Sequence, residues 1–163
     1  MTRRRELFIA GTALAAALAA AIAIVALATR GGGSRPSASA GEVIFRTGRD
    51  PDGRPVPRSG EAGGMMGGGM KWGGCADCHG IEARGATMPT FAAPDITYAN
   101  LTDPRGMLQP DGSRGPSYTD AAIRRAVMYG VDPDGDKLDW PMPRWRLSDS
   151  EWADLLAHLK TLR

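Results

Sequence analysis

Five consecutive residues, Cys75-Ala76-Asp77-Cys78-His79, constrain this chain more than any other part of its sequence. They contain both of its cysteines, so a scaffold stapled by several disulfides is excluded. Two thiols three positions apart can form thioethers with the two vinyl groups of one haem, and the histidine that follows can present a ring nitrogen to the iron. The motif therefore predicts one covalent haem c, attached through Cys75 and Cys78, with His79 as an iron ligand.

Other chemistries fit this motif less well. A dithiol redox site would need a βαβ setting, and no strand pattern of useful length occurs in the chain. A structural zinc site needs four ligands, and beyond the motif only the distant His158 is available as a further histidine or cysteine. Glycine and proline together make up 34 of the 163 residues, which leaves a small core. Because small domains usually need a staple, metal or cofactor, a haem would also complete the fold.

One long apolar segment precedes the motif. Residues Leu7–Ala28 form an uncharged run that would be about 33 Å long as a helix, enough to cross a hydrocarbon core of roughly 30 Å. An arginine triplet at residues 3–5 keeps the basic N-terminus, residues 1–6, in the cytoplasm by the positive-inside rule. We therefore expect a single-pass anchor over residues 7–28 in a bacterial inner membrane, with everything after it on the periplasmic side.

A cleaved secretory signal is the alternative to an anchor. Ala38-Ser39-Ala40 has the small-x-small form of a cleavage site, but the apolar run is longer than the roughly 7–15 residues usual in signal peptides. With either outcome the C-terminal part is exported.

The charge balance excludes one class of partner. Four of the 20 basic and one of the 18 acidic residues precede residue 31, which leaves 16 basic and 17 acidic residues and a net charge of −1. A balance of this kind gives no electrostatic footprint for nucleic acid.

The exported part is predicted to be all-α with long Gly/Pro-rich loops. Residues 29–40 read as a flexible Gly/Ser linker and residues 41–163 as one domain, which opens with a brief helix over Gly41–Thr47. Residues 48–74 show neither helical nor strand periodicity and are expected to form an extended loop.

Two further helices have recognisable ends. Thr119 is a plausible N-cap and Gly130 a C-terminal glycine for a helix over 119–129. Ser148 and Glu151 form a capping box for the last helix, and an apolar stripe at helical spacing follows it, made by Trp152, Leu155, Leu156, Leu159 and Leu162.

Residues 41–163 resemble a class I cytochrome c domain. The resemblance is based on GEVIF at residues 41–45, CADCHG at 75–80, MPRW at 142–145 and the terminal helix. It implies crossing N- and C-terminal helices around one haem, with Gly41 and Phe45 facing Leu155, Leu156 and Leu159. One departure is the Gly-rich loop, because the family usually has the attachment motif directly after its first helix.

The resemblance also implies the remaining haem contacts. Met142 occupies the position of the family's axial thioether, between two prolines that stiffen its loop. Met88 has the same Met-Pro context but lies only nine residues after His79, so Met142 is favoured as the sixth ligand. Pro94 is expected to accept the ring hydrogen of His79 through its carbonyl group, with Pro89 as the competing position.

Three other features receive simpler interpretations. Met65, Met66 and Met70 could bind Cu(I), although loop residues or cofactor cover are the more frequent roles of such methionines. The alternating aspartates at residues 132, 134 and 136 read as a turn and not as a calcium loop, because the required glycine is replaced by Lys137. His158 is expected to be packed or solvated and not to bind iron.

The sequence thus predicts an electron carrier and not an enzyme. His/Met ligation raises the reduction potential and leaves no open coordination position. The resemblance implies transfer of single electrons from a quinol-oxidising complex or a dehydrogenase to a terminal oxidase or reductase. The alternatives are a cytochrome subunit fixed in a larger oxidoreductase complex and, less favoured, a haem sensor or enzyme with an open sixth site.

Overall fold

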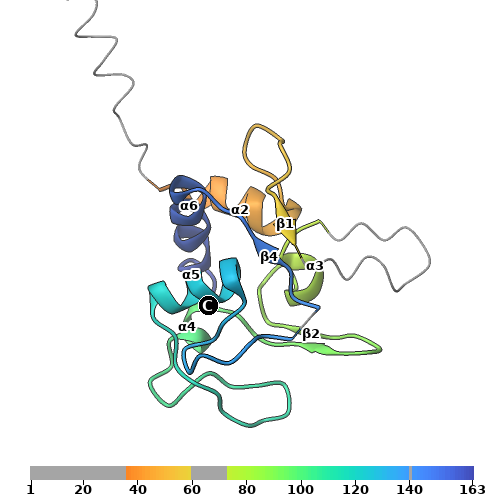
Figure 1. The fold of residues 1–163 in the computed structure, drawn as a ribbon, viewed down its shortest axis with the longest axis vertical. Helices are drawn as coiled ribbons and strands as arrows, with labels where there is room; N and C mark the ends of the chain where they lie inside the picture. Colours follow the sequence, from red (N-terminus) through yellow and green to blue (C-terminus); the bar gives the residue numbers. More distant parts are fainter. Residues whose placement is uncertain (1–35, 60–72, 140) are drawn as a thin grey trace, which may run out of the picture. The chain divides into compact units, whose positions relative to one another are not determined.

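The computed structural model describes residues 36–59, 73–139 and 141–163. Over these ranges the chain forms five helices and four strands of two residues each (Figure 1). The helices are α2 (Ala38–Thr47), α3 (Ala76–His79), α4 (Tyr98–Leu101), α5 (Asp120–Tyr129) and α6 (Asp149–Leu159), and the strands are β1 (Arg58–Ser59), β2 (Ala86–Thr87), β3 (Ala92–Ala93) and β4 (Arg144–Trp145). Strands β1 and β4 form one antiparallel pair, and β2 and β3 form another. The predicted helical class is confirmed for this part of the chain.

Helix α2 begins earlier than the sequence indicated. Its first residue is Ala38 and not Gly41, because the Ser37 side chain caps it by accepting a hydrogen bond from the backbone N–H of Ala40. The backbone N–H of Ser37 also donates to Asp154 Oδ1 on α6 over 2.6 Å. The predicted end of the linker at residue 40 is therefore wrong, because Ala38-Ser39-Ala40 forms the first turn of α2.

Helices α2 and α6 cross at Gly41, and this contact is the main packing interface of the domain (Figure 1). A Cβ on Gly41 would lie 2.8 Å from Cβ of His158 and closer still to the backbone carbonyl of Asp154. Because Gly41 lacks that atom, the two helices can approach until Ile44 and Phe45 are 1 % and 0 % exposed. Burial of each of these side chains contributes roughly 1.5–3 kcal/mol.

Both predicted ends of α5 and the predicted start of α6 are confirmed, whereas Leu162, the last residue of the predicted apolar stripe, lies beyond the end of α6 at Leu159. The Thr119 hydroxyl accepts from the backbone N–H of Ala122, and Gly130 ends α5 in the left-handed region. Ser148 and Glu151 form the capping box of α6 in both directions. These signals are local in sequence, so the residues that form them do not depend on how the rest of the domain packs.

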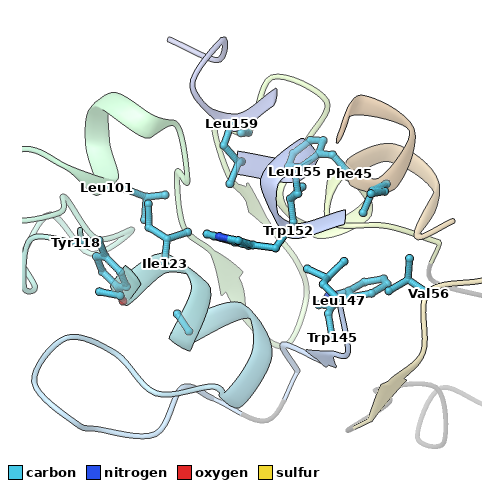
Figure 2. Close-up of a cluster of buried hydrophobic side chains, with 14 of the residues drawn as sticks. Phe45, Val56, Leu101, Tyr118, Ile123, Trp145, Leu147, Trp152, Leu155 and Leu159 are labelled. Atoms are coloured by element: carbon cyan, nitrogen blue, oxygen red, sulfur yellow. The ribbon is translucent and has the colours of Figure 1, made fainter. Parts of the chain in front are cut away.

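The core is organised around one tryptophan of α6. Figure 2 shows the indole of Trp152 extending from α6 toward Ile123 of α5 and Leu101 of α4, and it shows Trp145 and Leu147 on the other side, close to Val56. Strand β4 brings the latter pair into the core by pairing Trp145 with Arg58 of β1. The predicted loop over residues 48–74 thus contains a short strand, because its pairing partner lies far away in the sequence.

Some sequence predictions concern the membrane anchor or residues outside the described ranges. Within the described ranges, no helix has the length and apolar character needed to cross a membrane. The predicted anchor Leu7–Ala28, the start of the linker, and the methionines at 65, 66 and 70 all lie outside those ranges.

Candidate cofactor site

Helix α3 is a single turn that contains most of the attachment motif. Cys75 is its N-cap residue, and the backbone N–H of His79 donates to the carbonyl oxygen of Cys75 over 2.9 Å. Because residues three and four apart lie on one face of a helical turn, Cys78 and His79 share a face with Cys75. Both cysteines are free thiols and half-buried, whereas His79 is buried.

The two residues before the motif are fixed on both sides. The carbonyl oxygen of Gly73 accepts a hydrogen bond from Arg58 Nη1 over 2.8 Å, and its N–H donates to the Asp77 carboxylate. Gly74 packs so closely on the end of α2 that a Cβ there would lie 2.7 Å from the carbonyl carbon of Arg46. These contacts hold the start of α3 against α2. No sequence signal identified Arg58, while Asp77 stood inside the motif without a role.

The ring of His79 is oriented by a backbone carbonyl. Its Nδ1 lies 2.9 Å from the carbonyl oxygen of Pro94, the residue that the sequence favoured over Pro89 for this contact. Pairing of β2 with β3 returns the chain so that Pro94 follows directly on the second strand. With Nδ1–H donating to this carbonyl, Nε2 is the nitrogen left to bind a metal.

Burial favours the neutral form of Cys75, Cys78 and His79 alike. It raises the pKa of the Cys75 thiol to about 12 and raises the pKa of Cys78 as well. Burial lowers the pKa of His79, although its hydrogen bond to Pro94 and the charge of Asp95 oppose that shift. At neutral pH the site therefore presents two protonated thiols and one neutral imidazole, which is the metal-binding form of histidine.

The two candidate methionines lie in different settings. Met142 is half-buried in the loop before β4; its backbone N–H donates to Asp139 over 3.3 Å, and its carbonyl oxygen accepts from the Arg144 guanidinium. Met88 is half-buried in the hairpin between β2 and β3, and its backbone N–H donates to Phe91 over 2.8 Å. Iron binding by either sulfur stays a prediction.

The second histidine and the aspartate cluster outside the motif make contacts that belong to the packing of the fold. His158 is buried in the crossing of α2 and α6 with its ring centroid 5.2 Å from that of Phe45, which is the packed role expected for it. The aspartates at 132, 134 and 136 form a tight turn in which the N–H of Asp136 donates to the Asp132 carboxylate. Among the residues described, no group of three or more His, Cys, Asp or Glu side chains is arranged to hold a metal ion.

The residues at α3 fit a covalently attached haem. Two protonated thiols on the same helical face as an imidazole with one free nitrogen are the groups that thioether attachment and axial ligation require. The local fold supplies this arrangement through the Gly73–Gly74 contacts on one side and the Pro94 carbonyl on the other.

The comparisons with known proteins agree with this chemistry. A family model described as cytochrome c matches residues 72–163, more than half of the chain. The match includes α3, the Pro94 carbonyl, Met142 and α6, and it starts after α2. No curated protein and no solved structure gives a significant match.

Proposed function

This chain belongs to the cytochrome c family, and from that premise we propose that it is a membrane-tethered carrier of single electrons with one covalent haem. The family is one of haem-based electron transfer, and its membership accounts for the CxxCH motif at residues 75–79. The observation that best supports the proposal is the buried, oriented imidazole of His79. Its contact with the Pro94 carbonyl leaves a single ring nitrogen for the iron.

Each residue has a defined part in this proposal. The haem supplies an iron that cycles between two oxidation states without consuming a substrate. Cys75 and Cys78 would hold it covalently, and His79 would supply one iron ligand. Met142 would supply a second ligand from a loop stiffened by Pro141 and Pro143, which would leave no open position for a substrate. We therefore propose electron transfer and not catalysis.

We further propose that the haem domain works at the periplasmic face of a bacterial inner membrane. The support is the apolar run Leu7–Ala28 with its preceding arginines, followed by a Gly/Ser-rich stretch that gives the domain reach. A tether of this kind keeps the local concentration of membrane-bound partners high without a permanent interface. The proposed donor is a quinol-oxidising complex or a dehydrogenase, and the proposed acceptor a terminal oxidase or reductase.

Absorption spectra of the purified, haem-loaded chain test the ligand set. A host that attaches haem covalently should yield a protein with the weak far-red sulfur-to-iron band in its oxidised form. Met142→Ala should abolish that band and Met88→Ala should retain it, because the two methionines share a Met-Pro context but differ in proposed role. Cys75→Ala should leave haem attached by at most one thioether.

The alternatives predict different results. A covalent haem that lacks the far-red band and binds carbon monoxide when reduced would favour a haem sensor or enzyme over an electron carrier. Met142→Ala is the control with an open site. Co-purification of a fixed set of redox subunits in mild detergent would favour the complex-subunit reading. Complete absence of covalent haem would refute the proposal itself.

Fractionation tests the proposed location. The full chain should remain in the membrane pellet after an alkaline wash, whereas a chain that starts at residue 36 behind a cleavable export signal should be released. A full chain found in the soluble periplasmic fraction would refute the tether while leaving the haem chemistry intact.

A further inference from the structure

Arg144 is the first residue of β4 and lies two positions after Met142. Its backbone is fixed in the antiparallel pair with β1, opposite Ser59. Its side chain is half-buried. The guanidinium group therefore extends from a fixed strand toward the loop that precedes it.

That guanidinium contacts the loop at two carbonyl oxygens. Nη1 donates to the carbonyl oxygen of Met142, and Nη2 donates to that of Leu138 over 2.7 Å. A planar guanidinium offers both donors in one rigid fork, which the single ammonium group of lysine cannot reproduce. Arg144 thus joins two points of one loop that are four residues apart.

The loop needs a donor from outside itself. Pro141 and Pro143 flank Met142 and have no backbone N–H, so two of the three successive residues cannot take part in a backbone ladder. The N–H of Met142 makes a long bond, 3.3 Å, to Asp139. Charge-assisted hydrogen bonds from Arg144 replace what the prolines remove, and such bonds are stronger than neutral ones.

The end of α5 is shaped to admit this side chain. Gly130 ends the helix with φ of 67°, and its carbonyl oxygen accepts from the N–H of Leu138 over 2.8 Å. A Cβ on Gly130 would lie 2.5 Å from Cδ of Arg144 and would overlap its guanidinium. Helix α5, the loop and β4 therefore meet at one arginine, and glycine is required there both for the turn and for the space.

We propose that Arg144 is the positioning residue for Met142: its guanidinium holds the backbone at Leu138 and at Met142 so that the methionine sulfur is presented in one place. The part of this inference that concerns iron rests on the proposed function, whereas the part that concerns the loop does not. Arg144 acts through the loop backbone and does not itself bind the iron.

Amide hydrogen exchange and absorption spectra of the haem-loaded chain test this together. Arg144→Met removes both donors and should speed exchange of the Leu138 and Met142 amides by at least about tenfold, the equilibrium factor for loss of even one hydrogen bond from a charged donor. It should also weaken the far-red band without loss of covalent haem. Arg144→Lys should keep the charge and yet fail to restore either readout. Arg146→Met is the matched control, because Arg146 is exposed two residues further on.

If Arg144→Met folds poorly, the Trp152 amide on α6 should also exchange fast. A second pair of variants then provides the test. Gly130→Ala combines left-handed strain with displacement of Arg144. Gly135→Ala introduces similar strain, at φ of 97°, with no atom within 4 Å of the new Cβ. Only Gly130→Ala should speed exchange of the Met142 amide and weaken the far-red band.

Each outcome decides the proposal. Exchange of the loop amides in Arg144→Met within twofold of that in Arg146→Met would overturn it, and so would faster exchange with an unchanged far-red band. If the unmutated protein lacks the far-red band, the proposed iron ligation by Met142 is refuted. The amide exchange rates alone then decide whether Arg144 holds the loop.

Discussion

Substitution of Gly41 by alanine tests the closest contact in the domain. In an isolated helix this change stabilises by about 1 kcal/mol, because glycine has the poorer helix propensity. In the folded domain the added Cβ would lie 2.5 Å from the carbonyl carbon of Asp154 and 2.8 Å from Cβ of His158. Neither obstructing atom can rotate away, because one is backbone and the other is attached directly to it.

The cost of the substitution follows from these distances. Ordinary contact begins near 3.4 Å, so α2 and α6 would have to separate by about 0.9 Å to clear the carbonyl carbon of Asp154, and by more to clear its carbonyl oxygen. A gap of 0.5–1 Å loses roughly a quarter to a half of the packing energy of the atoms facing it. Ile44, Phe45 and Leu155, all at most 2 % exposed, contribute roughly 1.5–3 kcal/mol each. The loss is at least about 2.5 kcal/mol, and after the helix-propensity gain the net destabilisation is at least about 1.5 kcal/mol.

Urea unfolding of the haem-loaded protein measures this directly. With a slope of about 2 kcal/mol/M, Gly41→Ala should lower the midpoint by at least roughly 0.7 M and leave the slope unchanged. Ser39→Ala is the control, because Ser39 is exposed in the same helix and gains propensity alone. If Gly41→Ala is as stable as the unmutated protein or more stable, as propensity alone requires, the close helix crossing is refuted.

Two further substitutions test the capping of α6 and the buried histidine on it. Ser148→Ala removes the capping box with Glu151 and should destabilise by about 1 kcal/mol in the same assay; an unchanged midpoint would contradict this. Burial lowers the pKa of His158 in the folded state below the ordinary value near 6.5, so the unfolded chain binds its proton first on acidification and stability falls as the pH drops below about 6.5. His158→Phe should remove this part of the slope, since the neighbouring charges of Glu42 and Arg46 remain; identical pH profiles of midpoint between pH 7.5 and 5 would show that folding does not lower the pKa of His158.

The helix ends and the attachment chemistry could be predicted because their signals are local. A capping box needs two residues three positions apart, and the thiols and imidazole of the CxxCH motif lie within a single helical turn. Both ends of α5 and the start of α6 are therefore where the sequence indicated. The start of α2 was misplaced by three residues, because Ser37 acts as its cap while contacting Asp154, more than a hundred residues away.

The sequence by itself determined the cofactor chemistry and the helical class, since residues that lie next to each other along the chain decide both. Only the tertiary structure decided that Pro94 and not Pro89 orients His79, that Arg58 pairs its strand with β4, and that Arg144 reaches back to Met142 past Gly130. In each case the deciding contact joins backbone atoms to a partner brought near by chain folding. The sequence around a proline, a glycine or an arginine does not indicate which distant carbonyl group or side chain that residue will contact, because the contact depends on the packing of whole helices and strands.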